Sequence, residues 1–278
     1  MNPHDYCQQK AAASGSSFYY SFLFLPKAKR QAITALYAFC REVDDVADEC
    51  TDTAIARTKL AWWRAEIANL YAEKPQHPVT QALANAVRDY NLAEEHFQEI
   101  IDGMEMDLDQ NRYGDFKELH LYCYRVASVV GLLSASIFGY SDRKTLKYAH
   151  DLGLAFQLTN IVRDVGEDAR RGRIYLPLDE MAQHGVSEAD ILHSRESENV
   201  RRLLEFQIER AEEYYQRAFE ELPDADRRDQ RTGLVMAAIY RALLDEIRLG
   251  GCEKVLNQRV SLTPLRKLWL AWKSWLKG

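Results

Sequence analysis

Glycine and proline are scarce in this sequence, which has 13 glycines and 7 prolines among 278 residues. Together they fall well below the share of about 12% in an average chain. So few helix breakers argue against a strand-rich sandwich and favour long helices. Positive charge is also in deficit, because 36 lysines and arginines face 42 acidic residues and leave a net charge of −6. This composition excludes a generally basic nucleic-acid binder, so we expect no nucleic-acid partner.

Cysteine patterns and long apolar runs are missing as well. The five cysteines include no CxxC pair, so we expect neither a disulfide framework nor a cysteine-based zinc site, and a cytoplasmic location follows. The N-terminus has no apolar core of the signal-peptide kind. The longest apolar stretch, Val126–Tyr140, has 15 residues and is shorter than the ~20 needed to cross a bilayer. It predicts a buried helix instead.

Apolar residues recur at helical spacing along almost the whole chain. We find no repeat, linker or low-complexity segment, so the sequence predicts one all-α domain over residues 1–278. Ser187 and Asp190 have the spacing of a capping box for a short helix. The other helices are expected at about 26–48, 53–73, 78–91, 94–111, 115–140, 142–168, 197–221 and 225–249, followed by an amphipathic segment at about 263–278.

Two segments carry aspartates four residues apart. Asp44 and Asp48 form the first pair, and Asp164 and Asp168 form the second pair, 120 residues later. On a helix each pair lies on one face, one turn apart. Both segments are otherwise apolar, so these acidic faces are expected to point inward.

Buried carboxylates that repel one another need a compensating positive charge. At an effective dielectric constant near 20, two charges 4 Å apart interact by about 4 kcal/mol. Mg²⁺ meets this need, since it takes oxygen ligands and is usually held by one or two carboxylates together with substrate phosphates. Arg41 and Arg163 precede the two pairs and can grip a diphosphate bidentately. The basic loop Arg170–Arg173 follows the second pair and is a further candidate to cover bound diphosphate, or else a solvated surface loop.

Other cofactor motifs are absent. No histidine has the Glu-x-x-His spacing of a di-iron bundle, and the chain has no HExxH segment, Walker A loop or GxGxxG fingerprint.

Two further segments complete a pattern. Residues 14–22 read SGSSFYYSF, and residues 122–131 read YCYRVASVVG. Together with the aspartate pairs, they resemble the squalene/phytoene synthase family over nearly the whole chain. Within the family, the phrases GSSFYYSFLFLP, GMEMDLDQ and AFQLTNIVRDVGEDARRGRIYLPLDE are most similar to bacterial presqualene diphosphate synthases. The resemblance implies a single-domain helical bundle of the isoprenoid synthase type, with a central apolar cavity.

The resemblance also implies roles for individual residues. Asp44 and Asp48 match the first Mg²⁺-diphosphate motif and Asp164 and Asp168 the second, with Asn160 as an extra ligand. Tyr122 matches a tyrosine that assists proton transfer. The residues that match positions around the substrate diphosphates and the first isoprene unit are Ser14, Ser17, Phe18, Tyr37, Arg41, Gln157, Arg163, Tyr240 and Arg259. Asn160 belongs to this substrate pocket too.

The implied reaction is head-to-head condensation of two farnesyl diphosphates to presqualene diphosphate, in squalene and hopanoid biosynthesis. Ionisation gives an allylic cation, the second substrate's double bond captures it, and proton loss closes a cyclopropane; either Tyr122 or the released diphosphate takes the proton. The resemblance implies Mg²⁺, with Mn²⁺ as a substitute, and no NADPH for this first half-reaction. A downstream reductase or oxidase would be a partner.

Three other functions stay open. Phytoene synthase, acting on geranylgeranyl diphosphate, and full NADPH-dependent squalene synthase share the metal site. A non-catalytic, membrane-associated helical scaffold is the third, and it predicts no binding of Mg²⁺ or diphosphate.

The C-terminal segment is basic and amphipathic. From residue 254 onward it holds six lysines and arginines and no acidic residue. On a helix, the apolar residues Leu265, Leu268, Trp269, Trp272, Trp275 and Leu276 share one face, and basic residues face away. This pattern is typical of a helix that lies in a membrane interface. Peripheral contact with the inner face of the cytoplasmic membrane is therefore one expectation, and packing on the protein body is the other.

Overall fold

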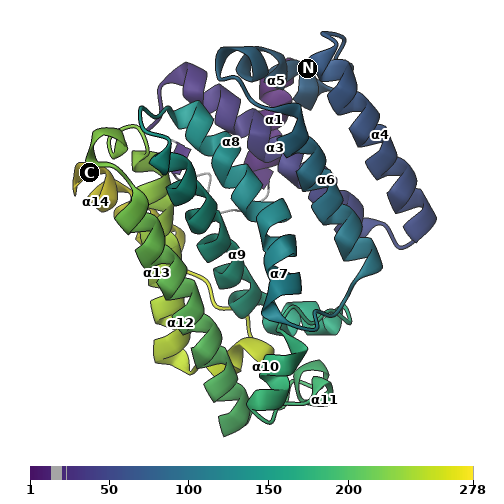
Figure 1. Cartoon of the computed structure of the whole chain (residues 1–278), viewed down its shortest axis with the longest axis vertical. Coiled ribbons are helices and arrows are strands. Elements are labelled where there is room, and N and C mark those ends of the chain that lie inside the picture. The colour runs from purple at the N-terminus through teal and green to yellow at the C-terminus, as the bar shows by residue number, and fades with distance from the viewer. Residues whose placement is uncertain (14–20, 23, 278) are drawn as a thin grey trace.

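The computed structural model describes residues 1–13, 21–22 and 24–277, and within these ranges its regular structure is helical (Figure 1). The α-helices are α1 (Pro3–Ala13), α3 (Lys27–Glu49), α4 (Thr53–Tyr71), α5 (Pro78–Asp89), α6 (Glu94–Asp109), α7 (Phe116–Cys123), α8 (Val129–Phe138), α9 (Lys144–Arg170), α10 (Leu178–Gln183), α11 (Glu188–Leu192), α12 (Glu198–Glu221), α13 (Arg231–Gly250) and α14 (Pro264–Lys277). Short 3₁₀ turns lie at Asp224–Asp226 and Cys252–Leu256. The predicted all-α fold class is confirmed.

Local sequence signals explain where several helices begin. The side chain of Asp52 accepts hydrogen bonds from the N–H groups of the first turn of α4, at 2.8 Å for Ala54. Ser197 caps α12 in the same way. The predicted capping box of Ser187 and Asp190 is present at the start of α11. These caps satisfy N–H groups that a helix cannot pair internally.

Two of the expected helices differ from the observed ones, and two observed helices were not expected. The stretch expected as one helix at 115–140 is α7 and α8 joined by a π-helical turn, Tyr124–Ser128. The helix expected from residue 225 begins at Arg231, because Pro223 is followed by a 3₁₀ turn. Helices α1 and α10 were not expected, since neither has a strong apolar stripe of its own.

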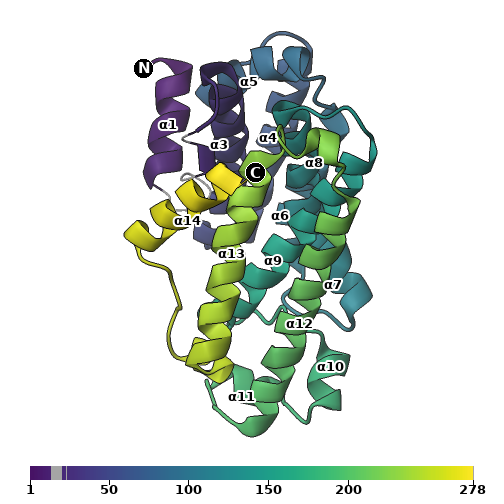
Figure 2. The same ribbon diagram turned by 90° about the vertical axis from the view of Figure 1, so that its left-hand side faces the viewer.

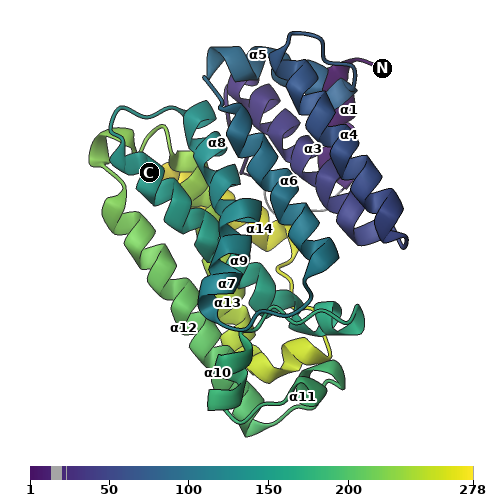
Figure 3. The same cartoon turned by 45° about the vertical axis from the view of Figure 1, so that its right-hand side comes forward.

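The helices form two halves that meet along α7 and α8. In Figures 1 and 3, α1, α3, α4, α5 and α6 lie on one side, and α9, α12 and α13 lie on the other. Each half has its own apolar core. Val129 and Leu133 of α8 belong to the first core, whereas Ala135 of α8 and Cys123 of α7 belong to the second. The cavity described below opens between these halves.

Helices α8 and α9 approach each other closely, and two glycines permit it. A methyl group at Gly131 would lie 2.3 Å from the carbonyl oxygen of Ala149. One at Gly153 would lie 2.6 Å from the carbonyl oxygen of Ala127, in the π-helical turn that leads into α8. The small residues of the 126–140 stretch therefore serve tight helix packing at these points.

Helix α9 carries the second aspartate pair, and Asp226 fixes its start. The buried Asp226 carboxylate accepts from the Ser141 N–H at 2.7 Å and the Thr145 hydroxyl at 2.6 Å. These bonds, opposed by burial, lower the pKa of Asp226 to about 2.

One helical stretch in the described chain, Phe116–Phe138, is long and apolar enough to cross a membrane by length and composition alone. Residues of this stretch contribute to both cores, which is also the position of a core helix in a bundle.

Candidate active site

A cavity of about 660 Å³ lies between the two halves of the bundle. Its walls come from α3, α6, α7, the π-helical turn, α9 with the loop that follows it, α13, the connection between α13 and α14, and the start of α14. All the predicted site residues that the structure describes line this one cavity: Tyr37, Arg41, Asp44, Asp48, Tyr122, Gln157, Asn160, Arg163, Asp164, Asp168, Tyr240 and Arg259. Ser14, Ser17 and Phe18 lie outside the described residues.

The lining has a charged part and an apolar part. The apolar part comprises Ile100, Met104, Val126, Ile161, Ile239, Leu243, Val260 and Leu262. The charged part has six acidic and six basic side chains among the described residues: Asp44, Asp48, Asp107, Asp164, Glu167 and Asp168, with Arg41, Arg163, Arg171, Arg173, Arg259 and Lys267. A ligand with an anionic head and an apolar tail matches both parts.

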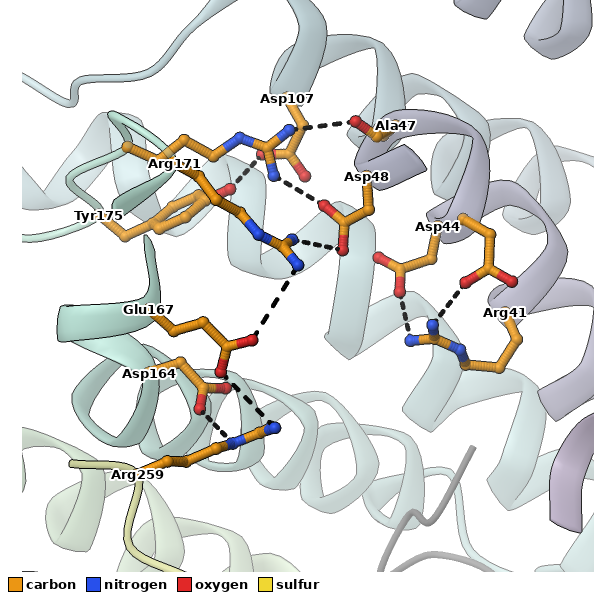
Figure 4. A network of polar contacts seen from close by, with 12 residues as sticks. Arg41, Asp44, Ala47, Asp48, Asp107, Asp164, Glu167, Arg171, Tyr175 and Arg259 are labelled. Carbon is orange, nitrogen blue, oxygen red and sulfur yellow. Dashed lines mark hydrogen bonds and ion pairs between the residues drawn. The ribbon is translucent and has the colours of Figure 1, made fainter. Parts of the chain in front are cut away.

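The first aspartate pair is held by arginines. Arg41 lies 2.5 Å from the Asp44 carboxylate, one turn along α3. Asp48 contacts two arginines from the loop after α9, Arg171 at 3.1 Å and Arg173 at 2.8 Å. Figure 4 shows Arg171 between Asp48 and Glu167, so a guanidinium spans the space between the two acidic faces.

The two carboxylates of the second pair, Asp164 and Asp168, differ in how many basic partners they have. Asp164 pairs with its neighbour Arg163 and with Arg259, whose Nε lies 3.0 Å away (Figure 4). Asp168 has no side-chain hydrogen bond or ion pair within the part of the chain that the structure describes. Asn160 lies on the same face, eight residues before Asp168, and its buried Oδ1 has no hydrogen-bond partner among the residues that the structure describes. The face of α9 therefore presents oxygen atoms that the protein itself leaves unsatisfied.

Burial shifts the acidity of these carboxyl groups. Burial, reinforced by the nearby Asp164, raises the pKa of Asp168 to about 7, although Arg173 opposes the shift. Burial also raises the pKa of Asp44 to about 6, against the effect of Arg41. Repulsion between Asp48 and both groups adds to each shift. The raised values therefore reflect burial and carboxylate repulsion that the nearby arginines only partly offset.

A third acidic group, Asp107 of α6, lies in the same cavity and was not predicted. It accepts hydrogen bonds from the Tyr175 hydroxyl at 2.7 Å and the Tyr122 hydroxyl at 3.0 Å. Burial raises its pKa to about 6, although these hydroxyls and Arg173 lower it. Burial and the Asp107 charge hold the pKa of Tyr122 well above its usual value. Tyr122 is therefore a neutral hydrogen-bond donor here.

Three aromatic and amide positions surround the charged groups. Tyr37 of α3 and Tyr240 of α13 line the cavity, and the Tyr240 ring lies 4.9 Å from that of Phe156. Gln157 accepts a hydrogen bond from the Asn160 amide at 3.3 Å, which aims the Asn160 oxygen away from Gln157.

Arg163 stays charged in the cavity wall. Its hydrogen bond with Asp164 keeps the pKa of Arg163 above its ordinary value despite burial.

The donor set suits Mg²⁺. Carboxylate and amide oxygens are its preferred protein ligands, and the unpartnered Asn160 oxygen and the unpaired Asp168 lie on one helix face. Among the described residues no three acidic, histidine or cysteine side chains converge as a ready-made metal cage. Mg²⁺ usually relies on one or two carboxylates and substrate phosphates, so a site completed by diphosphate fits these residues.

The lining residues that sequence reasoning missed are Asp107, Tyr175, Cys40, Glu167 and Lys267. Arg171 and Arg173 belong to the basic loop that the sequence offered as a candidate, and both line the cavity. One signal was available for Asp107: it follows Ile100 and Met104 at the spacing of one helix face, so an acid occupies an apolar stripe. Tyr175 carried no such signal, because it lies in a loop.

Comparison with known proteins agrees with this geometry. Residues 11–266 match the squalene/phytoene synthase family. Phytoene synthase from Arthrospira platensis is 39% identical over 95% of this chain and 90% of its own length. Several chloroplastic relatives at 36 to 37% identity are also phytoene synthases, and this chain spans about 60% of the length of three of them.

Two solved structures share the fold. A dehydrosqualene synthase in complex with a ligand superposes with a TM-score of 0.88 at 31% identity, over 99% of this chain and 96% of that one. Squalene synthase HpnC from Alicyclobacillus acidocaldarius superposes with a TM-score of 0.80 at 27% identity, over 90% of this chain and 94% of that one. The fold, the convergence of two aspartate faces on one cavity and the family match together show that this chain belongs to the squalene/phytoene synthase family of head-to-head prenyltransferases.

Proposed function

We propose that this chain joins two identical prenyl diphosphates into a cyclopropyl diphosphate within the cavity, with release of one diphosphate. One observation carries the proposal. Two acidic helix faces 120 residues apart in sequence line a single cavity together with five arginines. Such a site binds anionic leaving groups, and the apolar part of the lining accepts their hydrocarbon tails.

The arginines act on the leaving diphosphate. Arg41, Arg163 and Arg259 bind aspartates near the cavity and can turn their remaining N–H groups to phosphate oxygens. Asp44, Asp48, Asp164, Asp168 and Asn160 would hold Mg²⁺. When bound, Mg²⁺ supplies further positive charge that stabilises the departing diphosphate.

The rest of the lining protects the cation. Ile100, Met104 and Leu243 exclude water, which would otherwise capture the allylic cation. Tyr37 lines the cavity, and an aromatic ring there can stabilise positive charge by about 1–2 kcal/mol when desolvated. Tyr122 stays neutral and orients Asp107, so we assign final proton removal to the released diphosphate rather than to Tyr122.

The length of the prenyl tail distinguishes two candidate functions. The curated relatives at 35 to 39% identity are phytoene synthases, which supports geranylgeranyl diphosphate as substrate and phytoene as the final product. In that case the C40 cyclopropyl diphosphate is an intermediate, which loses its own diphosphate and a second proton as it rearranges to phytoene. This support is stronger than that for the farnesyl diphosphate expected from the sequence phrases.

The second candidate is condensation of two farnesyl diphosphates to presqualene diphosphate. The motif phrases GMEMDLDQ and AFQLTNIVRDVGEDARRGRIYLPLDE support it, as does the likeness to a dehydrosqualene synthase. In that case a separate reductase or oxidase would consume the product.

One experiment tests the reaction and the substrate together. The purified protein is incubated with Mg²⁺ and either farnesyl or geranylgeranyl diphosphate, with and without NADPH, and products are identified by mass spectrometry. A C40 product from the C20 substrate supports the first candidate, whereas a C30 cyclopropyl diphosphate that persists with NADPH supports the second. No condensation product with either substrate would refute the proposal.

A further inference from the structure

The exposed face of α14 is apolar. Leu265, Trp269, Trp272 and Leu276 are 79%, 51%, 55% and 65% exposed, and Leu268 adds to the same stripe. Their spacing of three or four residues places them along one side of the helix. One predicted member is elsewhere: Trp275 stacks on Phe24 at 5.1 Å and so faces the protein. Large exposed apolar side chains gathered on one helix mark an interaction surface.

The opposite face fixes α14 to the protein body. Ala271 is fully buried, and Lys267, Leu270 and Ser274 are half-buried. Figure 2 shows α14 beside α13 at the edge of the bundle, and the two helices are in contact. Arg266 also forms an ion pair with Glu246 of α13. The helix therefore already has a protein-facing side, and the apolar stripe is its other side.

A basic flank runs beside the stripe. At 100° per residue, Arg266 and Lys273 fall next to one another, about a quarter turn from the centre of the apolar stripe. The Lys273 ammonium group lies 4.6 Å from the Trp269 ring centroid, at the border of the two zones. No acidic residue occurs from 254 to 278, although the whole chain carries a net charge of −6.

The basic flank beside the apolar stripe favours an anionic bilayer over a second copy of this chain as the binding partner of α14. A two-fold contact between copies would set each basic flank close to its counterpart and add repulsion. A single 14-residue helix also offers less than the ~800 Å² per partner of a stable protein interface. An anionic bilayer suits both zones, because tryptophan and leucine enter the interface and basic groups lie near lipid phosphates.

Helix α14 is also connected to the cavity. Arg259, Val260 and Leu262 precede it directly and line the cavity, as does Lys267 within it. A bilayer against the exposed stripe would therefore lie near the cavity wall.

We propose that the stripe Leu265, Leu268, Trp269, Trp272 and Leu276 docks this protein peripherally on bilayers that contain anionic lipid, with Lys273 near the lipid phosphates. The observations behind this docking surface do not depend on which prenyl diphosphate the protein uses.

The test is flotation of the full chain with vesicles. One set is phosphatidylcholine alone, and the other contains one third phosphatidylglycerol. Wild-type protein is expected to float with the anionic vesicles. The triple variant L265S/W269S/W272S is expected to bind at least about tenfold more weakly, since three apolar groups no longer enter the interface. Lys273→Gln is expected to weaken binding to anionic vesicles about fivefold.

A matched control removes exposed apolar groups from other helices. Ile55 and Leu249 are 53% and 85% exposed on α4 and α13, so I55S/L249S is expected to bind as wild type. Melting curves check folding, which exposed substitutions leave intact. The proposal is overturned if wild type binds neither vesicle, or if the triple variant binds as wild type does. It is also overturned if light scattering shows a vesicle-independent dimer that the triple variant splits.

Discussion

The two aspartate pairs share one spacing but differ in how the protein neutralises them. On α3, Arg41 binds Asp44, and Arg171 and Arg173 bind Asp48. On α9, Asp164 has arginine partners, whereas Asp168 has none among the described residues and is surrounded by Asp164, Asp107 and Asp48. Equal spacing in sequence therefore does not mean equal electrostatics, and the end of α9 is where an added cation gains most.

Replacing Asp168 tests the comparison with the largest expected effect. Asp168→Asn should lower kcat/KM at least about a thousandfold, because the metal site proposed on α9 would lose its unpaired carboxylate. The matched control is Asp45→Asn on α3: Asp45 contacts Arg41 at 2.5 Å and Lys10 at 2.8 Å but does not line the cavity. The control should retain turnover within about threefold. A catalytically normal Asp168→Asn enzyme would break the comparison.

The same variant has a second consequence for stability. The pKa of Asp168 is about 7 in the folded chain, whereas an aspartate in the unfolded chain has its ordinary pKa of 3.8. Between pH 4 and 7 the folded chain binds more protons than the unfolded chain, so this group's contribution to stability falls as pH rises through that window. At pH 8 without Mg²⁺, Asp168→Asn should therefore raise the free energy of unfolding by about 1 kcal/mol. Urea denaturation of both proteins would measure the difference.

The arginines that bind Asp48 give the next largest effect. Arg171→Gln combined with Arg173→Gln should lower kcat/KM about ten- to a hundredfold, because both guanidinium groups at the cavity are lost. Arg170 provides the control: it lies 3.5 Å from the Leu256 carbonyl oxygen and does not line the cavity. Steady-state kinetics of R171Q/R173Q and R170Q should differ strongly. Similar losses in both would show that the loop acts through folding alone.

The pH dependence of metal binding sharpens the comparison further. Protons and Mg²⁺ compete for Asp168, so below its pKa of about 7 the affinity should fall by up to about tenfold for each pH unit. Calorimetric titration of Mg²⁺ with a non-reactive diphosphate analogue, from pH 6 to 8, would measure it. The slope should flatten in Asp168→Asn and persist in Asp45→Asn. An unchanged slope in Asp168→Asn would assign the proton elsewhere.

Tyr122 is expected to have the smallest effect. Because its hydroxyl is a neutral donor to Asp107, Tyr122→Phe removes one hydrogen bond and should lower kcat less than about tenfold. Mg²⁺ affinity should stay as in wild type. A loss above a thousandfold in product assays would instead identify Tyr122 as the proton acceptor.

The periodic helices and both aspartate pairs were predictable because they depend on local patterns. Spacing alone placed Asp44 with Asp48 and Asp164 with Asp168 on inward faces, and the Ser187 capping box was recognisable from two residues. The family resemblance then supplied the remaining pocket positions, and every one that is described lines the cavity.

The missed features depend on contacts across the fold. The pairing of Asp48 with Arg173 joins residues 125 apart, which no local pattern encodes. The π-helical turn at Tyr124–Ser128 lies within a sequence that reads as continuous helix. The different surroundings of Asp164 and Asp168 arise only once α9 faces α3 across the cavity and the C-terminal connection brings Arg259 to Asp164, so spacing could not reveal them.

We propose that the end of α9 that carries the unpaired Asp168 receives the metal. Anomalous diffraction from crystals soaked with Mn²⁺ and a thio-substituted prenyl diphosphate tests it most directly. We predict Mn²⁺ signal within coordination distance of Asp168, on the α9 face that also carries Asn160, with the analogue's diphosphate completing the shell. A signal confined to other acidic groups, with Asp168 facing only water, would contradict the account.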